Sequence, residues 1–290
     1  MDGQSLAQGA VLADKYKILD VIGRGGFGIT YLAECSWSRE RVAVKELFWA
    51  GHMRRAADGA ALEAADPAEQ ADADGLCERF LREARTLYEF RDEPGVVRIE
   101  DYFRENGTAY IVMEYLSGET LEQRVRRAGP MDPAELCRML RGALSSLSRM
   151  HAAGWVHRDI SPENLMLLPD GRIKLLDFGA VRRYGEQLRR NSYYQKGSYS
   201  PPEQYSAEGR LGPWTDVYAI CATIYRCVTG VRPPDSLARG YKDDLPAPSS
   251  LNSAVTPALE RALLRGLALE PERRFRSVDE LAAALEKSAD

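Results

Sequence analysis

The sequence predicts an α+β protein that begins with an antiparallel sheet and continues as a mainly helical part. Alternating apolar residues separated by turn pairs dominate residues 16–113, interrupted by one helical stripe. From Asp132 onward, apolar residues recur at helical spacing behind helix-capping residues such as Asp132, Thr256 and Ser277. The 290 residues exceed one typical core, so two lobes or one large domain are expected.

The composition is that of a soluble globular protein, with 44% hydrophobic and 28% charged residues. A net charge of −4 gives no reason to expect nucleic acid as a partner. Five scattered cysteines without a CxxC pair are expected to be buried hydrophobes in a reducing cytosol. Neither a signal peptide nor a membrane helix is visible, so we expect a cytoplasmic chain; an anchor beyond residue 290 stays open.

Five strands are expected in the first part. They cover residues 16–22, 30–33, 42–45, 96–103 and 109–113. The last two flank Asn106-Gly107, a favoured type I′ turn pair. Residues 50–75 are rich in Ala and Asp and poor in large apolar groups, which predicts an extended insertion that is mobile or only partly helical.

The first turn is rich in glycine, at Gly23, Gly25, Gly26 and Gly28. Glycine lets backbone N–H groups approach a phosphate closely. A dinucleotide site would need a helix directly afterwards, but β-type residues 29–32 follow. The pattern therefore favours a strand–loop–strand flap, with a plain glycine-rich hairpin as the alternative.

The third strand ends at Lys45, and the helical stripe that follows the insertion carries Glu83 beside Phe80 and Leu87. A carboxylate that faces the protein body needs a cation, because an unpaired buried charge is very costly. Lys45 is the favoured partner of Glu83, and Arg79 one turn earlier on the helix is the alternative.

In the second part, Asp159 follows a short apolar run and Asn164 comes five residues later. Asp177 ends another apolar run, and the turn pair Asp170-Gly171 lies between the runs. If the two runs pair, all three side chains converge. Their oxygens suit a hard divalent cation such as Mg²⁺.

Together these motifs resemble the loops of protein kinases. Residues 157–164 spell HRD and a following Asn, and residues 177–179 spell DFG. The spelling GGFGITYLA, HRDISPENLM and PPEQY is most similar to bacterial Hanks-type (eukaryotic-like) serine/threonine protein kinases, and the resemblance runs from about residue 16 to 285. It implies a bilobal fold with a five-stranded antiparallel sheet and one helix in the N-lobe, a hinge and a mainly helical C-lobe.

The resemblance also implies boundaries and roles. The boundaries are a tail at 1–15, an N-lobe at 16–113, a hinge at 114–116 and a C-lobe at 117–288. ATP would be bound by Ile22, Gly23, Gly25, Gly26, Gly28, Thr30, Ala43, Lys45, Met113, Glu114, Leu116, Met166 and Asp177. Asn164 and Asp177 would hold Mg²⁺, while Asp159 would accept the proton of a Ser or Thr hydroxyl on a protein substrate.

The segment after residue 179 resembles an activation segment that ends at Pro201-Pro202-Glu203. The resemblance implies a buried pair between Glu203 and Arg274, and an anchoring role for Asp216 beneath the catalytic loop. Arg158 could bind a phosphate placed on the segment by autophosphorylation. The candidate hydroxyls are Ser192, Tyr193, Tyr194, Ser198 and Ser200.

One position departs from the family pattern: Ser161 stands where a lysine is expected. The departure supports an alternative function, a pseudokinase or nucleotide-binding scaffold without phosphotransfer. Lys196, directly before Gly197-Ser198, is the candidate for a substitute catalytic cation, and a solvated loop charge is the other interpretation of this lysine.

Overall fold

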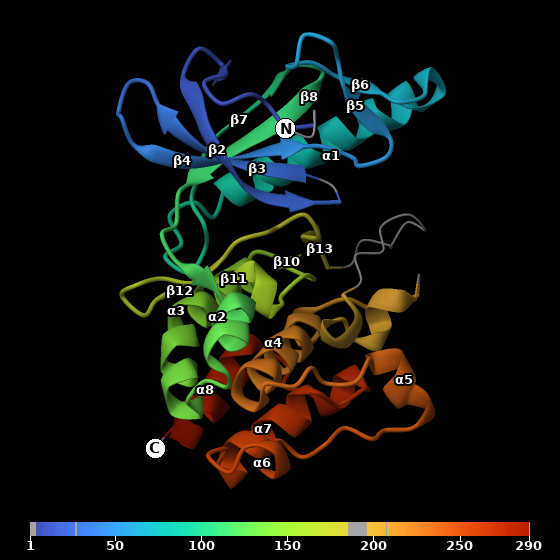
Figure 1. Ribbon diagram of the computed structural model, residues 1–290. Helices are drawn as coiled ribbons and strands as arrows, with labels where there is room; N and C mark the ends of the chain where they lie inside the picture. Colours follow the sequence, from blue (N-terminus) through green and yellow to red (C-terminus); the bar gives the residue numbers. More distant parts are fainter. Residues whose placement is uncertain (1–3, 27, 185–195, 207, 290) are drawn as a thin grey trace. The chain divides into compact units, whose positions relative to one another are not determined.

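The computed structural model describes residues 4–26, 28–184, 196–206 and 208–289. The chain divides into two compact units. The first combines Met1–Asp92 with Val97–Leu116, and the second combines Glu93–Val96 with Ser117–Asp290. The α+β fold class expected from the sequence is confirmed: a sheet with one long helix makes the first unit, and helices dominate the second (Figure 1).

Within the described residues, the sheet of the first unit has six antiparallel strands in the order β1-β2-β3-β4-β8-β7 (Figure 1). The strands are β1 (Val11–Leu12), β2 (Tyr16–Gly25), β3 (Gly28–Cys35), β4 (Arg41–Leu47), β7 (Ile99–Glu105) and β8 (Thr108–Glu114). Helix α1 (Gln70–Tyr88) packs on β7 and β8. The Asn106-Gly107 turn has positive φ at both residues, as a type I′ turn requires.

The five expected strands are present, and a sixth, β1, lies within the segment that was expected to be an N-terminal tail at residues 1–15. Leu12 of β1 pairs with Tyr16 and is 1% exposed, and Leu6 is buried in the same core. Burial of Leu6 and Leu12 attaches this segment to the sheet, because each buried leucine contributes about 2 kcal/mol.

The insertion at residues 50–75, predicted to be mobile or only partly helical, is helical over part of its length and also contains a hairpin that the sequence did not predict. Strands β5 (Met53–Arg55) and β6 (Leu62–Ala64) form an antiparallel hairpin, a short 3₁₀ helix follows at Pro67–Glu69, and α1 begins at Gln70. Met53 and Leu62 are buried in the core of the sheet. The low apolar content of the insertion did not indicate the hairpin, because a charged residue holds the hairpin in place.

That residue is Arg55, which forms a buried bidentate ion pair with Glu46 of β4. The two nitrogen–oxygen distances are 2.8 and 2.7 Å, and Glu46 is fully buried. The hydroxyls of Tyr31 and Tyr110 donate to the same carboxylate at 2.7 and 2.8 Å. Arg55 also donates to the backbone oxygen of Ala60 within the hairpin turn. Because the buried charges are paired and hydrogen-bonded, the desolvation cost is offset.

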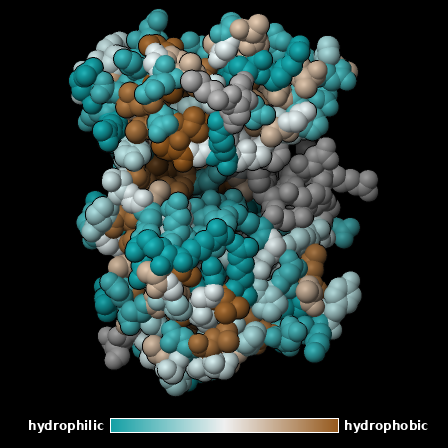
Figure 2. Space-filling view, viewed as in Figure 1, coloured by the Kyte–Doolittle hydropathy of each residue, from teal (hydrophilic) through white to brown (hydrophobic). Residues whose placement is uncertain are grey.

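The second unit is mainly helical. Its helices are α2 (Leu121–Ala128), α3 (Pro133–Ala152), α4 (Pro213–Thr229), α5 (Ser236–Tyr241), α6 (Pro248–Leu251), α7 (Pro257–Gly266) and α8 (Val278–Ala289). Strands β9 (Glu119–Thr120), β11 (Leu165–Leu167) and β12 (Ile173–Leu175) form one small sheet, and β10 (Trp155–Val156) pairs with β13 (Arg182–Arg183). The viewed surface of this unit is mostly hydrophilic (Figure 2).

Three expected helix starts are confirmed. Asp132, Thr256 and Ser277 each accept a hydrogen bond from the backbone N–H three residues later. The expected central helix is α4, which is buried on almost every side. Its Cys221 faces Gly266 of α7, where an added Cβ would lie 2.2 Å from the sulfur, so a glycine is required at that contact.

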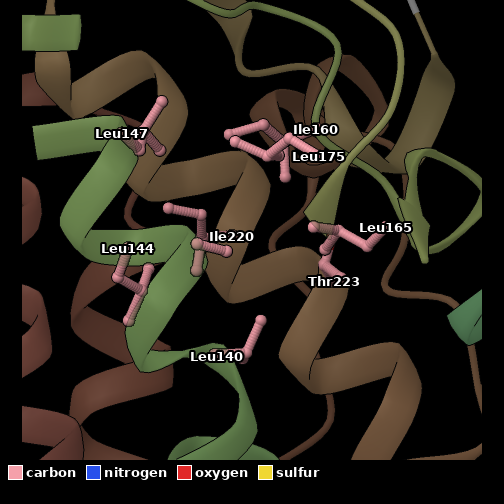
Figure 3. Close-up of a pocket in the computed structure, with 9 residues that line it drawn as sticks. Leu140, Leu144, Leu147, Ile160, Leu165, Leu175, Ile220 and Thr223 are labelled. Atoms are coloured by element: carbon pink, nitrogen blue, oxygen red, sulfur yellow. The ribbon is translucent and has the colours of Figure 1, made fainter. Parts of the chain in front are cut away.

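The core between α3 and α4 contains a small cavity of about 10 Å³, scarcely the space of one water molecule. Leu140, Leu144 and Leu147 line it from α3, and Ile220 and Thr223 from α4 (Figure 3). The Thr223 hydroxyl is buried and has no hydrogen-bond partner among the described residues. All five cysteines are buried and free, as expected. Among the described residues, no helix is long and apolar enough to cross a membrane.

We predict that Arg55→Met lowers the free energy of unfolding by about 3–5 kcal/mol, because it leaves the Glu46 carboxylate buried without a cation. Arg54→Met is the matched control: Arg54 pairs with Glu63 at 3.3 Å on the exposed face of the same hairpin and should cost less than about 1 kcal/mol. Urea unfolding measures both. Equal losses would contradict the buried pair as the anchor of the hairpin.

We predict that Thr223→Val raises the free energy of unfolding by about 1 kcal/mol, because it replaces an unsatisfied buried hydroxyl with a methyl group of similar shape. Thr229→Val is the control on the same helix. The Thr229 hydroxyl donates to the Tyr225 carbonyl at 2.7 Å and accepts from the Val231 N–H, so its loss should destabilise by about 1–2 kcal/mol. The hypothesis fails if chemical denaturation finds both variants destabilised alike.

Candidate active site

The glycine-rich turn lies between β2 and β3, with Phe27 outside the described residues. Gly28 pairs with Leu47, and an added Cβ there would lie 2.9 Å from the Glu46 carbonyl oxygen. Only glycine lets β3 begin so close to β4. Gly28 is also adjacent to the Lys45 side chain, with the position of an added Cβ 3.6 Å from Lys45 Cε. The turn and the lysine are therefore neighbours by construction of the sheet.

Lys45 lies in β4, paired with Thr30 and Ile111. Its ammonium nitrogen is 6.0 Å from the centre of the Phe80 ring on α1. Glu83 follows Phe80 by three residues and is half-buried on the same helix. The structure thus places Lys45 beside the helix that carries Glu83, and their ion pair stays a prediction.

The other residues expected to bind the nucleotide in the first unit lie along β2, β4 and β8. Ala43 pairs with Met113, and Ile22 on β2 is 45% exposed. Glu114 exchanges backbone and side-chain hydrogen bonds with Arg98. The first unit ends at Leu116, which is the last of the residues expected to form the hinge.

The loop of the second unit that carries Asp159 is anchored by Asp216, as expected. Its Oδ2 accepts the N–H of His157 and its Oδ1 accepts the N–H of Arg158, both at 2.8 Å. His151 at the end of α3 lies 2.7 Å from Oδ2. Burial alone would raise the pKa of Asp216, but the hydrogen bonds from His151 and from the His157 N–H outweigh it and hold this pKa below its ordinary value.

Asp216 supports an unusual backbone conformation. Arg158 has φ +70°, a region that costs a side chain of this size about 1–3 kcal/mol. Its N–H is held by Asp216, and its carbonyl oxygen accepts from Gln204 Nε2 at 3.0 Å. Sequence reasoning missed Gln204, although the letters PPEQY contain it. The Arg158 guanidinium is buried and donates to the Ala180 carbonyl.

The three residues expected to converge lie where the paired strands end. Leu165 of β11 pairs with Leu175 of β12, so Asn164 precedes one strand and Asp177 follows the other. Asn164 Nδ2 donates to both the backbone oxygen and Oδ2 of Asp159, at 2.8 and 2.7 Å. The Gly179 N–H donates to Asp177 Oδ1 at 3.0 Å.

This arrangement fits a magnesium ion. Both amide hydrogens of Asn164 are used by Asp159, which leaves its Oδ1 as the atom able to coordinate a cation. The Asp177 carboxylate supplies a second oxygen site on the neighbouring strand end. Hard oxygen donors of this kind, completed by phosphate and water, suit Mg²⁺.

Several interactions act in opposite directions on the pKa of Asp159. Burial raises its pKa, and the charge of Asp177 adds to the rise. Lys196, His157 and the hydrogen bond from Asn164 oppose it. The Lys196 nitrogen lies 3.6 Å from Asp159 Oδ1 and 3.4 Å from Glu163 Oε2. Sequence reasoning missed Glu163, which is inside the HRDISPEN motif but carried no pattern of its own.

The end of the activation segment is fixed to the helices of the second unit. Glu203 forms the expected buried bidentate pair with Arg274, at 2.7 and 3.0 Å. Ser200 is buried, and its hydroxyl accepts the Lys196 N–H. Ser200 is therefore a poor phosphate acceptor in this arrangement. Ser192, Tyr193 and Tyr194 lie outside the described residues.

Comparisons with known proteins agree with this geometry. Residues 16–245 match the protein kinase domain family. A probable serine/threonine-protein kinase of Streptomyces coelicolor is 32% identical over 96% of this chain and 40% of the relative. The serine/threonine-protein kinase PknE of Mycobacterium tuberculosis is 29% identical over 98% of this chain and 48% of the relative. The chain thus spans about half or less of the length of these curated relatives.

A solved structure described as the apo form of PpkA-294 matches with a TM-score of 0.86 and 30% identity, over 98% of this chain and all of that one. The sheet with its glycine-rich turn, the anchored HRD loop and the family match together define a protein kinase fold. The chain belongs to the protein kinase domain family.

We predict that Asp216→Asn lowers the free energy of unfolding by about 3 kcal/mol at pH 7, because the N–H groups of His157 and Arg158 are bound by different oxygens of Asp216 and an amide has only one acceptor oxygen. The folded-state pKa of Asp216 is depressed, so its stabilisation is present above its ordinary pKa and is lost as pH falls through the folded value. The difference between wild type and variant should therefore be constant from about pH 5 to 7 and shrink below about pH 4.

Asp243→Asn is the matched control for this prediction. Asp243 also has a depressed pKa, caused first by its hydrogen bond from Arg239, but it is half-exposed on the surface. Its loss should cost less than about 1 kcal/mol. Urea unfolding at several pH values measures both variants, and an Asp216→Asn protein as stable as Asp243→Asn would refute the anchor.

Proposed function

We propose that this chain is the catalytic domain of a serine/threonine protein kinase, which transfers the γ-phosphoryl group of ATP to a hydroxyl of a protein substrate. The observation that carries the proposal is the contact set around Asp159, where Asn164 donates twice and Lys196 approaches. Phosphoryl transfer needs little covalent chemistry from the protein, and positioned charges of this kind do most of the work.

The roles follow from the residues. Lys45 and the glycine-rich turn bind the phosphates, and Glu83 orients Lys45. Asp159 lies where its carboxylate can accept the proton of the substrate hydroxyl. The hydrogen bonds from Asn164 hold that carboxylate in one rotamer, and Asp216 holds the loop that carries it. Ile22, Ala43, Met113, Glu114, Leu116 and Met166 are proposed to contact the nucleotide base.

Asn164 and Asp177 would hold Mg²⁺, which when bound neutralises charge on the phosphate oxygens. The activation segment ends at Glu203, which the ion pair with Arg274 holds in place. The presence of such a segment supports a protein rather than a small molecule as substrate. Five buried free thiols suit a reducing compartment, so we propose the cytoplasm as the place of action of this domain.

A pseudokinase is the second candidate, favoured by the serine at position 161. It differs from the first in one measurable property. Incubation with radiolabelled ATP, Mg²⁺ and a generic protein substrate should label serine or threonine in the substrate or in the chain itself. Nucleotide binding without any labelled residue would favour the pseudokinase.

We predict that Asp159→Asn lowers kcat by about a hundredfold or more and leaves the Kd for ATP within about threefold, because the lost group acts on the hydroxyl and not on the phosphates. Steady-state kinetics and equilibrium titration with ATP measure the two quantities separately. Glu208→Gln, an exposed carboxylate elsewhere in the second unit, is the control and should leave both unchanged. Equal losses of affinity and turnover in Asp159→Asn would contradict the role of Asp159 as proton acceptor.

A further inference from the structure

The position at which the resemblance leads us to expect a lysine holds a side chain that cannot supply charge. Ser161 is fully buried, and its hydroxyl has no hydrogen-bond partner among the described residues. It is both neutral and secluded. Phosphoryl transfer builds negative charge on the phosphate oxygens, and removal of one stabilising donor typically costs about a hundredfold in rate. Another cation is therefore required if the chain is an active enzyme.

Lys196 is a cation that the structure places beside Asp159. Its nitrogen lies 3.6 Å from Asp159 Oδ1 and 3.4 Å from Glu163 Oε2, with 30% of the side chain exposed. Both distances exceed the 2.7–2.9 Å of a tight charge-assisted hydrogen bond. An ammonium group has three donors, so two loose carboxylate contacts leave it able to bind a further oxygen.

The backbone of Lys196 is held in place by its own surroundings. Its N–H donates to Ser200 Oγ at 2.8 Å. The Ser200 carbonyl oxygen accepts from Ser236 Oγ at the start of α5, at 2.7 Å. The next residue, Gly197, has φ +49° and accepts from the Tyr205 hydroxyl at 3.3 Å. These bonds fix the backbone of the segment to α5 and to the 3₁₀ helix that contains Tyr205. A lysine in an unrestrained surface loop would lack such bonds.

The charged residues around Lys196 leave its ammonium group available to the site at Asp159. Glu163 is shared, because Arg232 lies 3.7 Å from its other oxygen. Arg232 in turn lies 3.5 Å from Glu122, which Arg226 also pairs. With a second cation on Glu163, the charge of Lys196 is not consumed by that carboxylate.

We propose that Lys196 is a catalytic residue that binds the γ-phosphoryl group during transfer, in place of the lysine absent at position 161. The inference rests on the proposed function. In the step, the substrate oxygen forms a bond to the γ-phosphorus and its proton passes to Asp159. The bond from phosphorus to the bridging β–γ oxygen breaks, and ADP leaves with the electron pair. Lys196 gives up no proton and forms no covalent bond.

One consequence distinguishes this chain from a kinase whose cation sits on the catalytic loop. The cation here is part of the activation segment, which the hydrogen bonds of Ser200 to Lys196 and Ser236 hold in place. Catalysis would therefore depend on the position of this segment, because a shift of the segment away from Ser236 would also move the Lys196 ammonium group away from Asp159. A kinase with the lysine at position 161 would keep it in either state.

The test compares four proteins with wild type: Lys196→Met, Lys196→Arg, Lys196→Met combined with Ser161→Lys, and Lys242→Met as a control on an exposed lysine of the same unit. For each, kcat and KM for ATP are measured, together with the Kd for ADP by calorimetry and the midpoint of thermal unfolding. ADP lacks the γ-phosphoryl group, so its affinity reports the rest of the nucleotide site and is independent of turnover.

We expect Lys196→Met to lower kcat by about a hundredfold or more, with the Kd for ADP within about twofold of wild type and an unchanged unfolding midpoint. Lys196→Arg, or the addition of Ser161→Lys, should recover at least about tenfold of the loss, since either restores a cation. Lys242→Met should behave as wild type.

Each other outcome has a definite meaning. A wild type that transfers no phosphate refutes the proposed function itself. An active wild type with normal kcat in Lys196→Met overturns the inference alone. A loss in Lys196→Met that extends to ADP affinity, or that neither charge-restoring change recovers in a folded protein, assigns Lys196 to structure and also overturns it.

Discussion

The loop that carries Asp159 depends on one buried carboxylate. Asp216 accepts two consecutive backbone N–H groups, from His157 and Arg158, and thereby holds Arg158 in a strained conformation with positive φ. Asp159 is the next residue, so the direction of its side chain is set by that bend. A helix that is buried almost all round, α4, is the platform for Asp216. The apolar core of the second unit is thus connected directly to the position of the proposed proton acceptor.

A similar logic operates in the first unit, where a second buried carboxylate fixes a different segment. Glu46 follows Lys45 in β4 and gathers Arg55 and two tyrosine hydroxyls. An ion pair therefore joins the insertion hairpin to β4, the strand that carries Lys45. In both units a charged group inside the core is fully paired, so it orders local backbone and does not destabilise it.

The arrangement around Asp159 is the basis of the proposal that a cation from another segment replaces the lysine expected at position 161. Ser161 removes a positive charge from the catalytic loop, and Lys196 brings one from the activation segment to within 3.6 Å of Asp159. Glu163 and Arg232 complete a row of alternating charges beside it. The proposed exchange moves the cation onto a segment whose position depends on Ser200 and Ser236. The proposal for Lys196 therefore rests on its position in space and not on its position in the motif.

The resemblance to protein kinases implied the pairing of Glu203 with Arg274. The sequence alone determined the fold class, the strands of the first sheet, and the helix starts at Asp132, Thr256 and Ser277. These features follow from local periodicity, capping chemistry and motif spacing, which a chain carries in its letters. Only the tertiary structure decided that the insertion is ordered by Arg55, that Gln204 holds Arg158, and that Lys196 shares its charge between Asp159 and Glu163. Each of these contacts joins residues from separate segments, and the energy of a charge or a hydrogen bond depends on burial and distance, which no local pattern encodes.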